Sequence, residues 1–297
     1  MKILKSEQYI SEKLNIKPVS KNRLAGCGGK EPEIDDETRQ FIEDNHLVWN
    51  PSTRCYDCDG DIEVSNDIVS DGRLKIRFGH VKGYFDCSYS NLTTLDGAPR
   101  KVGGDFDCNH NKLTMLKGTP QEIGGKFNCS SNILTSLEGA PRKVGKDFDC
   151  SNSYLTSLNG APQEVGGCFN CSNNNLTTLE GASQEVGGYF DCNSNKLTTL
   201  EGAPKVGGGF CCSANNLTTR EGAPQEVGGD FDCVDNKLTT LEGAPQKVGG
   251  DFVCSHNNLT TLEGAPQEIG GDVDCSHNRN LVLPKNKPNW IKGKITQ

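Results

Sequence analysis

A near copy of the stretch GGDFDCNHNKLT (residues 103–114) returns about every 21 residues over most of the chain. The interval between the repeating cysteines is 21 residues except from Cys192 to Cys212, where it is 20. The cysteine that marks each unit is Cys87, Cys108, Cys129, Cys150, Cys171, Cys192, Cys212, Cys233, Cys254 or Cys275. A fixed period of this length is typical of a solenoid, in which each unit buries its apolar face only against its neighbours. With 35 glycines and 33% hydrophobic residues, the 297-residue chain favours an elongated fold with a thin core over one large globular core.

Each unit contains a short strand. Phenylalanine and cysteine alternate with a period of two, as in Phe106 and Cys108, which predicts that both point into the core. The asparagine three residues after the cysteine, such as Asn111, is short enough to bond buried backbone where the chain turns; Ser90 and Ser153 replace it in two units and should do so less well. Two leucines follow, and Gly-Ala-Pro turns the chain into an extended return leg.

The unit resembles a known family. VxxxFxCxxNxL, as in 248–259, is similar to the leucine-rich repeat with phenylalanine and cysteine in leucine positions, and the short proline-bearing unit resembles the bacterial type found in secreted effectors. The pattern DFDCSxNxLTxLEGAPxxVGG is closer still to leucine-rich-repeat proteins of large tailed bacteriophages. The resemblance implies a β-rich solenoid with a parallel β-sheet on the concave face, an extended, proline-bearing convex side, and a concave surface that binds other proteins. Some effectors carry a ubiquitin-ligase domain after the array, but only a short segment follows the repeats here, so that activity is not implied.

The domain organisation follows from the limits of the array. We expect an N-terminal helix and linker over 1–33, a small α/β N-terminal cap over 34–82, ten leucine-rich repeats over 83–281 and a C-terminal cap over 282–297. The elements expected in the caps are helices over 7–14 and 35–45, a linker over 16–33, a hairpin from 47–50 to 55–58, a degenerate strand at 62–64, and a C-terminal seal made by Leu281, Leu283, Trp290 and Ile291.

The charge is unevenly distributed. The formal charge of the chain is −8, while residues 1–30 and 279–297 each carry +5, so the body between them carries −18. An acidic body repels the phosphates of nucleic acids, so we do not expect the array to bind DNA or RNA. No apolar run is long enough to cross a membrane, and the start MKILKSEQYI lacks the apolar stretch of a signal peptide. We therefore expect a protein of the cytoplasm whose 15 cysteines are reduced.

The sequence contains only weak candidates for metal-binding or catalytic motifs. Cys55 and Cys58 have CxxC spacing, but no second pair accompanies them and the stretch copies the Phe-Asp-Cys strand. Residues 57–64 alternate carboxylates like a calcium loop, yet the glycine is the fourth residue and Ile68 occupies the twelfth position. No pairing of a nucleophile with histidine is apparent. We expect no metal, no cofactor and no enzymatic activity.

The expected binding surface is the concave sheet. If phenylalanine and cysteine point inward, the residues on either side of phenylalanine point outward, and eleven of them are aspartates. The candidate partner-binding residues are Tyr84, Asp86, Asp107, Lys126, Asp149, Asp191, Tyr189, Asp230, Asp232 and Asp251, with His110, His256 and His277 nearby. The same alternation predicts exposed thiols at Cys168 and Cys211. In the irregular unit 201–224, Arg220 stands in a leucine position and is expected to keep its charge in water. An alternative is that the aspartates are only a solvated repeat consensus.

Our leading hypothesis is a non-enzymatic phage protein. It would act as an inhibitor of a protein with which the bacterial host defends itself against phages, an anti-defence role. It would bind a basic patch on that protein through the acidic concave face, in the cytoplasm of the host. The alternative is a structural component of the virion or of its assembly, addressed by the N-terminal stretch SEQYISEKLNIKPVS, which is similar to segments that recur in large-phage proteins. An enzyme with an unrecognised site in residues 1–80 is the third hypothesis.

Overall fold

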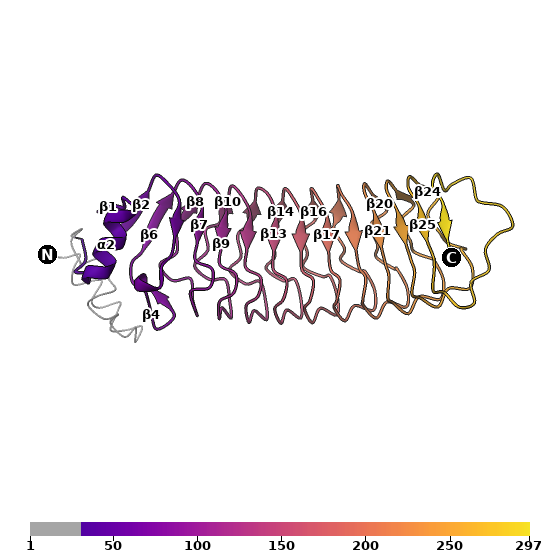
Figure 1. Ribbon diagram of the computed structural model, residues 1–297, viewed down its shortest axis with the longest axis horizontal. Helices are drawn as coiled ribbons and strands as arrows, with labels where there is room; N and C mark the ends of the chain where they lie inside the picture. Colours follow the sequence, from indigo (N-terminus) through magenta and orange to yellow (C-terminus); the bar gives the residue numbers. More distant parts are fainter. Residues whose placement is uncertain (1–30) are drawn as a thin grey trace, which may run out of the picture.

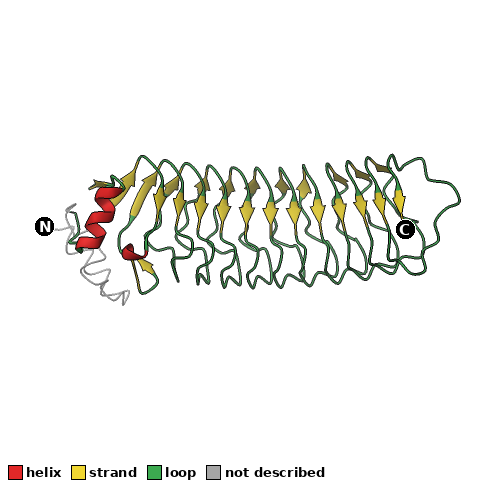
Figure 2. Ribbon diagram, in the orientation of Figure 1, coloured by secondary structure: helices red, strands yellow, loops and turns green. Residues whose placement is uncertain are grey.

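The computed structural model describes residues 31–297, which form a parallel β-solenoid capped at one end by a helix (Figure 1). Successive turns follow one another along a nearly straight axis, and each turn contributes two short strands joined by loops (Figure 2). The strands form two twelve-stranded sheets. The expected fold class, a repeat solenoid with a parallel sheet and extended return legs, is confirmed.

We name the sheets after their inward residues. The valine sheet contains β1 (Val48–Asn50), β2 (Cys55–Cys58), β6 (Phe78–Val81), β8 (Lys101–Val102), β10 (Glu122–Ile123), β12 (Lys143–Val144), β14 (Glu164–Val165), β16 (Glu185–Val186), β18 (Lys205–Val206), β20 (Glu226–Val227), β22 (Lys247–Val248) and β24 (Glu268–Ile269). The phenylalanine sheet contains β3 (Ile62–Glu63), β7 (Phe85–Asp86), β9 (Phe106–Asp107), β11 (Phe127–Asn128), β13 (Phe148–Asp149), β15 (Phe169–Asn170), β17 (Phe190–Asp191), β19 (Phe210–Cys211), β21 (Phe231–Asp232), β23 (Phe252–Val253), β25 (Val273–Asp274) and β26 (Ile295–Thr296).

A glycine pair separates the two strands of most turns and lets the turns stack closely. A Cβ placed on Gly124 would lie 2.3 Å from the carbonyl oxygen of Gly103 in the preceding turn, so no larger residue fits. The glycine of Gly-Ala-Pro is required for a different reason, because Gly139 has φ 89°, in the left-handed region. The valine strand itself was not predicted from the sequence, since two residues are too few to show an alternating pattern.

The phenylalanine and cysteine columns fill the core as predicted. From Phe85 to Phe252 the neighbouring rings are 4.8–5.8 Å apart between centroids, and every one of them is fully buried. The column cysteines are also fully buried free thiols. Several donate to the strand of the next turn; the Cys129 Sγ, for example, lies 3.3 Å from the carbonyl oxygen of Asp149.

The predicted asparagine ladder is present. In one turn the Asn132 Nδ2 donates to the carbonyl oxygens of Cys108, Cys129 and Ser130 at 3.0, 3.0 and 3.2 Å, and its Oδ1 accepts the N–H of Leu113 at 3.0 Å. Each asparagine therefore satisfies backbone groups in its own turn and in the preceding one.

Serine is the poorer substitute that the sequence predicted. The Ser153 Oγ is buried without a hydrogen-bond partner, and the Ser90 Oγ donates only to the carbonyl oxygen of Ser88.

Arg220 is the largest departure from the sequence prediction. Its side chain does not reach water but is fully buried at a leucine position of the core. The Nη2 donates to the carbonyl oxygen of Thr240 at 2.6 Å and the Nη1 to the Cys233 Sγ at 3.5 Å, while the Nε has no partner. The prediction of a solvated charge was wrong because neighbouring turns close over this position on both sides.

The N-terminal cap covers the first turn. Helix α2 (Asp36–Asp44) packs Phe41 and Ile42 onto the core, next to the 3-10 helix η2 (Asn66–Ile68). Asp35 caps the helix by accepting the Thr38 N–H at 2.8 Å, and hydrogen bonding with the side chain and backbone of Thr38, together with Lys75, lowers the pKa of Asp35 to about 2. Strands β1 and β2 form an antiparallel hairpin, as do the short strands β4 (Val69–Ser70) and β5 (Arg73–Leu74).

The C-terminal segment closes the last turn. Leu281 and Ile291 are buried, Leu283 and Trp290 pack against the core, and β26 pairs with β25. The helix expected over 7–14, the stretch 6–20 and most of the linker over 16–33 lie outside the described residues. Within 31–297, no helix is long and apolar enough to cross a membrane.

Candidate protein-binding surface

The residues that follow each phenylalanine form a half-buried column on the outer face of the phenylalanine sheet. The Asp149 Oδ1 accepts the N–H of Ser151 at 2.9 Å, which fixes the turn out of the strand. The same bond, from the residue two positions on, is accepted by Asp86, Asp107, Asn128, Asn170, Asp191, Asp232 and Asp274. One oxygen of each carboxylate thus has a structural role, which asparagine performs equally well.

Carboxylates in this column are mostly interleaved with neutral residues. Asn128 and Asn170 separate Asp107, Asp149 and Asp191, and their amide groups donate to the preceding carboxylate at 3.2 and 3.4 Å. Interleaving doubles the distance between charges to ~9.6 Å, which reduces their repulsion in water from ~0.8 to ~0.4 kcal/mol. The face remains acidic without stacked charges over this stretch.

The residues that precede each phenylalanine make a second kind of bond. The Asp105 Oδ1 accepts the N–H of Lys126, the corresponding residue of the next turn, at 2.8 Å. Asp147, Asp230 and Asp251 repeat this arrangement. Lys126 also forms an ion pair with Asp147, with 2.9 Å between Nζ and Oδ2, which helps to lower the pKa of Asp147. Lys126 is therefore already paired within the face.

Tyr84 lies at the N-terminal end of the face. Its hydroxyl donates to the Glu63 Oε1 at 2.7 Å, and this bond raises the pKa of Tyr84 to about 12. The side chain is thereby oriented toward the cap.

Tyr189 forms the most distinctive feature of the face. Gly209, the next residue in its column, has no side chain, and a Cβ there would lie 2.6 Å from the Tyr189 ring. Burial and a hydrogen bond with Cys211 raise the pKa of the Tyr189 hydroxyl well above its usual value.

Cys211 is buried, which corrects the sequence prediction that its thiol is exposed. It is 5% exposed and lies 3.0 Å from the Ser213 Oγ and 3.8 Å from the Asp232 Oδ2. Strand alternation does turn this residue outward, but Tyr189 from the preceding turn covers it. Cys168, predicted to be exposed in the same way, is exposed.

The ten predicted residues share one face but do not form one site. They extend from β7 to β23, with Tyr84 near the cap and Asp251 eight strands later in the sheet order. Asp191 and Asp232 flank Cys211 in the strand register and so lie close to Tyr189. We did not predict from the sequence that Asp191, Cys211 and Asp232 lie together around Tyr189. Gly209, the one glycine in the column of Tyr189, was the signal that could have indicated this grouping.

The histidines lie at the exposed corner after the strand. The ring of His110 stacks on Tyr89 with centroids 4.3 Å apart, and His256 stacks on His277 at 4.2 Å. Cys55 and Cys58 lie on β2 and are buried. Among residues 31–297 no cluster of three or more histidine, cysteine or acidic side chains could hold a metal ion.

No protein-family model matches the sequence, and the search of curated proteins finds no match. Among solved structures, the chain is similar to YopM from Yersinia enterocolitica WA-314, with a TM-score of 0.52 and 18% sequence identity. The match covers 81% of this chain and 60% of the YopM chain, so the protein spans about three fifths of that relative. At this identity the likeness shows the fold. The likeness and the strand order together show a parallel β-solenoid built from short repeats.

Proposed function

We propose that the protein is a non-enzymatic scaffold that binds a partner protein with a basic patch through the outer face of the phenylalanine sheet. One observation carries the proposal: the two outward columns of this face hold eleven aspartates against one lysine, and that lysine is paired with Asp147. Complementary charge across an interface steers association and selects partners.

Tyr189 supplies an anchor within the acidic face. Its ring is half-buried beside Gly209, with Cys168 exposed in the neighbouring turn. A rigid aromatic side chain near the centre of a surface is the type of residue that contributes most to binding energy. The partner would place an apolar group against Tyr189 and basic groups around it.

The proposal extends to the biological setting. The repeat pattern resembles leucine-rich-repeat proteins of large tailed phages, which supports a phage protein that inhibits a defence protein in the cytoplasm of its bacterial host. The stretch over residues 6–20 favours a second candidate, a component of the virion. Mass spectrometry of purified virions distinguishes the two, because only a packaged component is found in the particles.

A capture experiment with three full-length forms tests the binding face. The neutralised form carries Asp149→Asn, Asp191→Asn and Asp232→Asn; asparagine keeps the turn-forming acceptor, as it does at Asn128 and Asn170. The control carries Glu180→Gln, Glu201→Gln and Glu242→Gln, which remove the same charge from exposed loops outside both sheets. We expect the wild type and the control to capture the same protein from bacterial lysate and the neutralised form to lose it. Equal capture by all three forms would refute the proposed face.

A further inference from the structure

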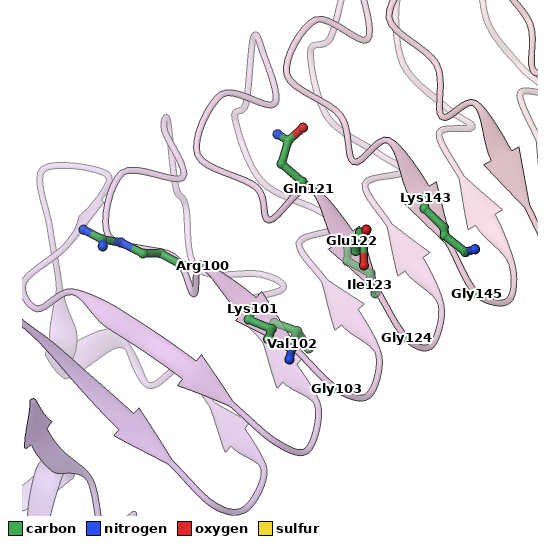
Figure 3. Close-up of a pocket in the computed structure, with 10 residues that line it drawn as sticks. All are labelled: Arg100, Lys101, Val102, Gly103, Gln121, Glu122, Ile123, Gly124, Lys143 and Gly145. Carbon is green, nitrogen blue, oxygen red and sulfur yellow. The ribbon is translucent and has the colours of Figure 1, made fainter. Parts of the chain in front are cut away.

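The outer face of the valine sheet carries a ladder of charged side chains. The residue before each valine or isoleucine points outward, and adjacent members are neighbours in the strand register. In order, the ladder is Lys101, Glu122, Lys143, Glu164, Glu185, Lys205, Glu226, Lys247 and Glu268. All are exposed except the half-buried Glu268. Figure 3 shows Lys101, Glu122 and Lys143 on three successive strands.

A flat track of glycine runs beside the ladder. The residue after each valine or isoleucine is glycine, as at Gly103, Gly124 and Gly145 in Figure 3. Two shallow depressions of about 570 and 510 Å³ lie over this track. With backbone alone on one side of the ladder, a second flat surface can approach the sheet closely.

Pairing within the chain explains only part of the ladder. Lys143 and Glu164 are 2.8 Å apart between Nζ and Oε2, and Lys247 and Glu268 are 3.4 Å apart. Strict alternation would satisfy such pairs in every turn. The ladder instead places Glu164 next to Glu185, and this one break reverses the sign of every later position.

The reversal makes the ladder antisymmetric about Glu185. Four members precede Glu185 in the order plus, minus, plus, minus, and four follow it in the same order. If the nine charges alternated strictly, a second, antiparallel copy of the ladder would place a like charge opposite every position. With the observed order, an antiparallel second copy places an opposite charge at every position except Glu185.

We propose that this face binds a second copy of the chain in an antiparallel, two-fold arrangement with the axis at Glu185. The opposed pairs are Lys101 with Glu268, Glu122 with Lys247, Lys143 with Glu226 and Glu164 with Lys205, each formed twice. A two-fold interface requires this kind of self-complementary surface. The two phenylalanine sheets are not part of the contact, so the dimer presents two copies of the acidic face.

The size of the face fits a weak dimer. Eight intervals of ~4.8 Å and four residues of ~3.3 Å give a strip of about 38 by 13 Å, or about 1,000 Å² for both copies. This lies at the lower end of specific interfaces. Because exposed ion pairs contribute little each, we expect a dissociation constant in the micromolar range, sensitive to salt.

A mixing experiment with two charge-reversed forms of the full chain tests the proposal. The first carries Lys101→Glu and Lys143→Glu, and the second carries Glu226→Lys and Glu268→Lys. Either form alone opposes like charges at four further positions besides Glu185, whereas the two together oppose unlike charges at those four positions. Sedimentation velocity should show a dimer for the wild type, a monomer for each variant alone, and a restored dimer in the equimolar mixture.

Two outcomes would overturn the interface. One is a wild type that stays monomeric up to about 1 mM, where association is worth only about 4 kcal/mol. The other is a mixture that stays monomeric although the wild type dimerises, which would place the contact elsewhere. Circular dichroism checks that both variants remain folded: Lys101, Lys143 and Glu226 are exposed, and Glu268, which pairs with Lys247 and Lys292, is half-buried.

Two single neutralisations locate the axis. Glu185→Gln removes the one like-charge contact and should lower the dissociation constant about fourfold. Its neighbour Glu164→Gln removes an attraction to Lys205 of the other copy at two symmetry-related places and should raise the constant by about 15-fold. Equal effects of the two changes would contradict an axis at Glu185.

Discussion

Arg220 points its Nη1 at the Cys233 Sγ, 3.5 Å away, inside a core where both side chains are fully buried. No carboxylate within residues 31–297 forms an ion pair with this guanidinium, and its Nε has no partner. The corresponding position of the next turn is Leu241, which is also buried. A buried charge without a counter-charge is costly, so this turn is a local weakness in the array.

Replacing Arg220 with leucine should therefore stabilise the protein. We expect Arg220→Leu to raise the free energy of unfolding by about 1–4 kcal/mol, because leucine fills an apolar site without burying a charge. Urea denaturation followed by circular dichroism measures the change. A loss of stability would mean that the bonds to Thr240 and Cys233 compensate the charge.

Ser153→Asn should repair the asparagine ladder. The buried Ser153 Oγ has no partner, whereas the corresponding Asn132 and Asn174 each satisfy several backbone groups. Since each net hydrogen bond contributes about 1 kcal/mol, a gain of about 1–2 kcal/mol in unfolding free energy is expected after the entropy of ordering the side chain. Asn132→Ala is the matched control and should destabilise the fold. If Ser153→Asn leaves stability unchanged, the ladder contributes less than its geometry implies.

The repeat allowed most of the fold to be predicted. Phenylalanine, cysteine and asparagine recur at fixed positions. Because the turns stack in register, each of these residues has the same surroundings in every turn. Arg220 and Cys211 were assigned wrongly because their surroundings come from the adjacent turns, which alternation within a strand does not describe. The acidic columns could be recognised in the sequence. The turn-forming role of Asp149 and the covering of Cys211 by Tyr189 could not, because they depend on contacts that only the structure shows.

Thiol labelling tests the cover over Cys211. In the native wild type, a maleimide reagent should modify Cys168 within the array and leave Cys211 and the column cysteines unmodified, because burial raises the pKa of the column thiols well above the ordinary value. Tyr189→Ala should make Cys211 react at a rate close to that of Cys168. Peptide mapping identifies the labelled residues. Rapid labelling of Cys211 in the wild type would contradict its burial.

Asp232 should make stability depend on pH. Burial, with a smaller effect of Asp191 and Asp230, raises the pKa of Asp232 above 3.8. Its ionised form is therefore disfavoured in the folded state: the cost is full above the folded pKa and disappears as pH falls below the unfolded value. Asp232→Asn should be more stable than the wild type at pH 7, and the difference should vanish toward pH 3. A difference that grows on acidification would have the wrong sign.

The salt dependence of association with the captured partner tests the acidic face most directly. We expect the association rate constant of the wild type to fall steeply as ionic strength rises, because screening shortens the reach of the face to about 8 Å at 0.15 M. The form with asparagine at 149, 191 and 232 should associate more slowly at low salt and show a shallower dependence, whereas the control with glutamine at 180, 201 and 242 should match the wild type. If both triple variants follow the wild-type curve, the acidic face of the phenylalanine sheet does not guide the partner.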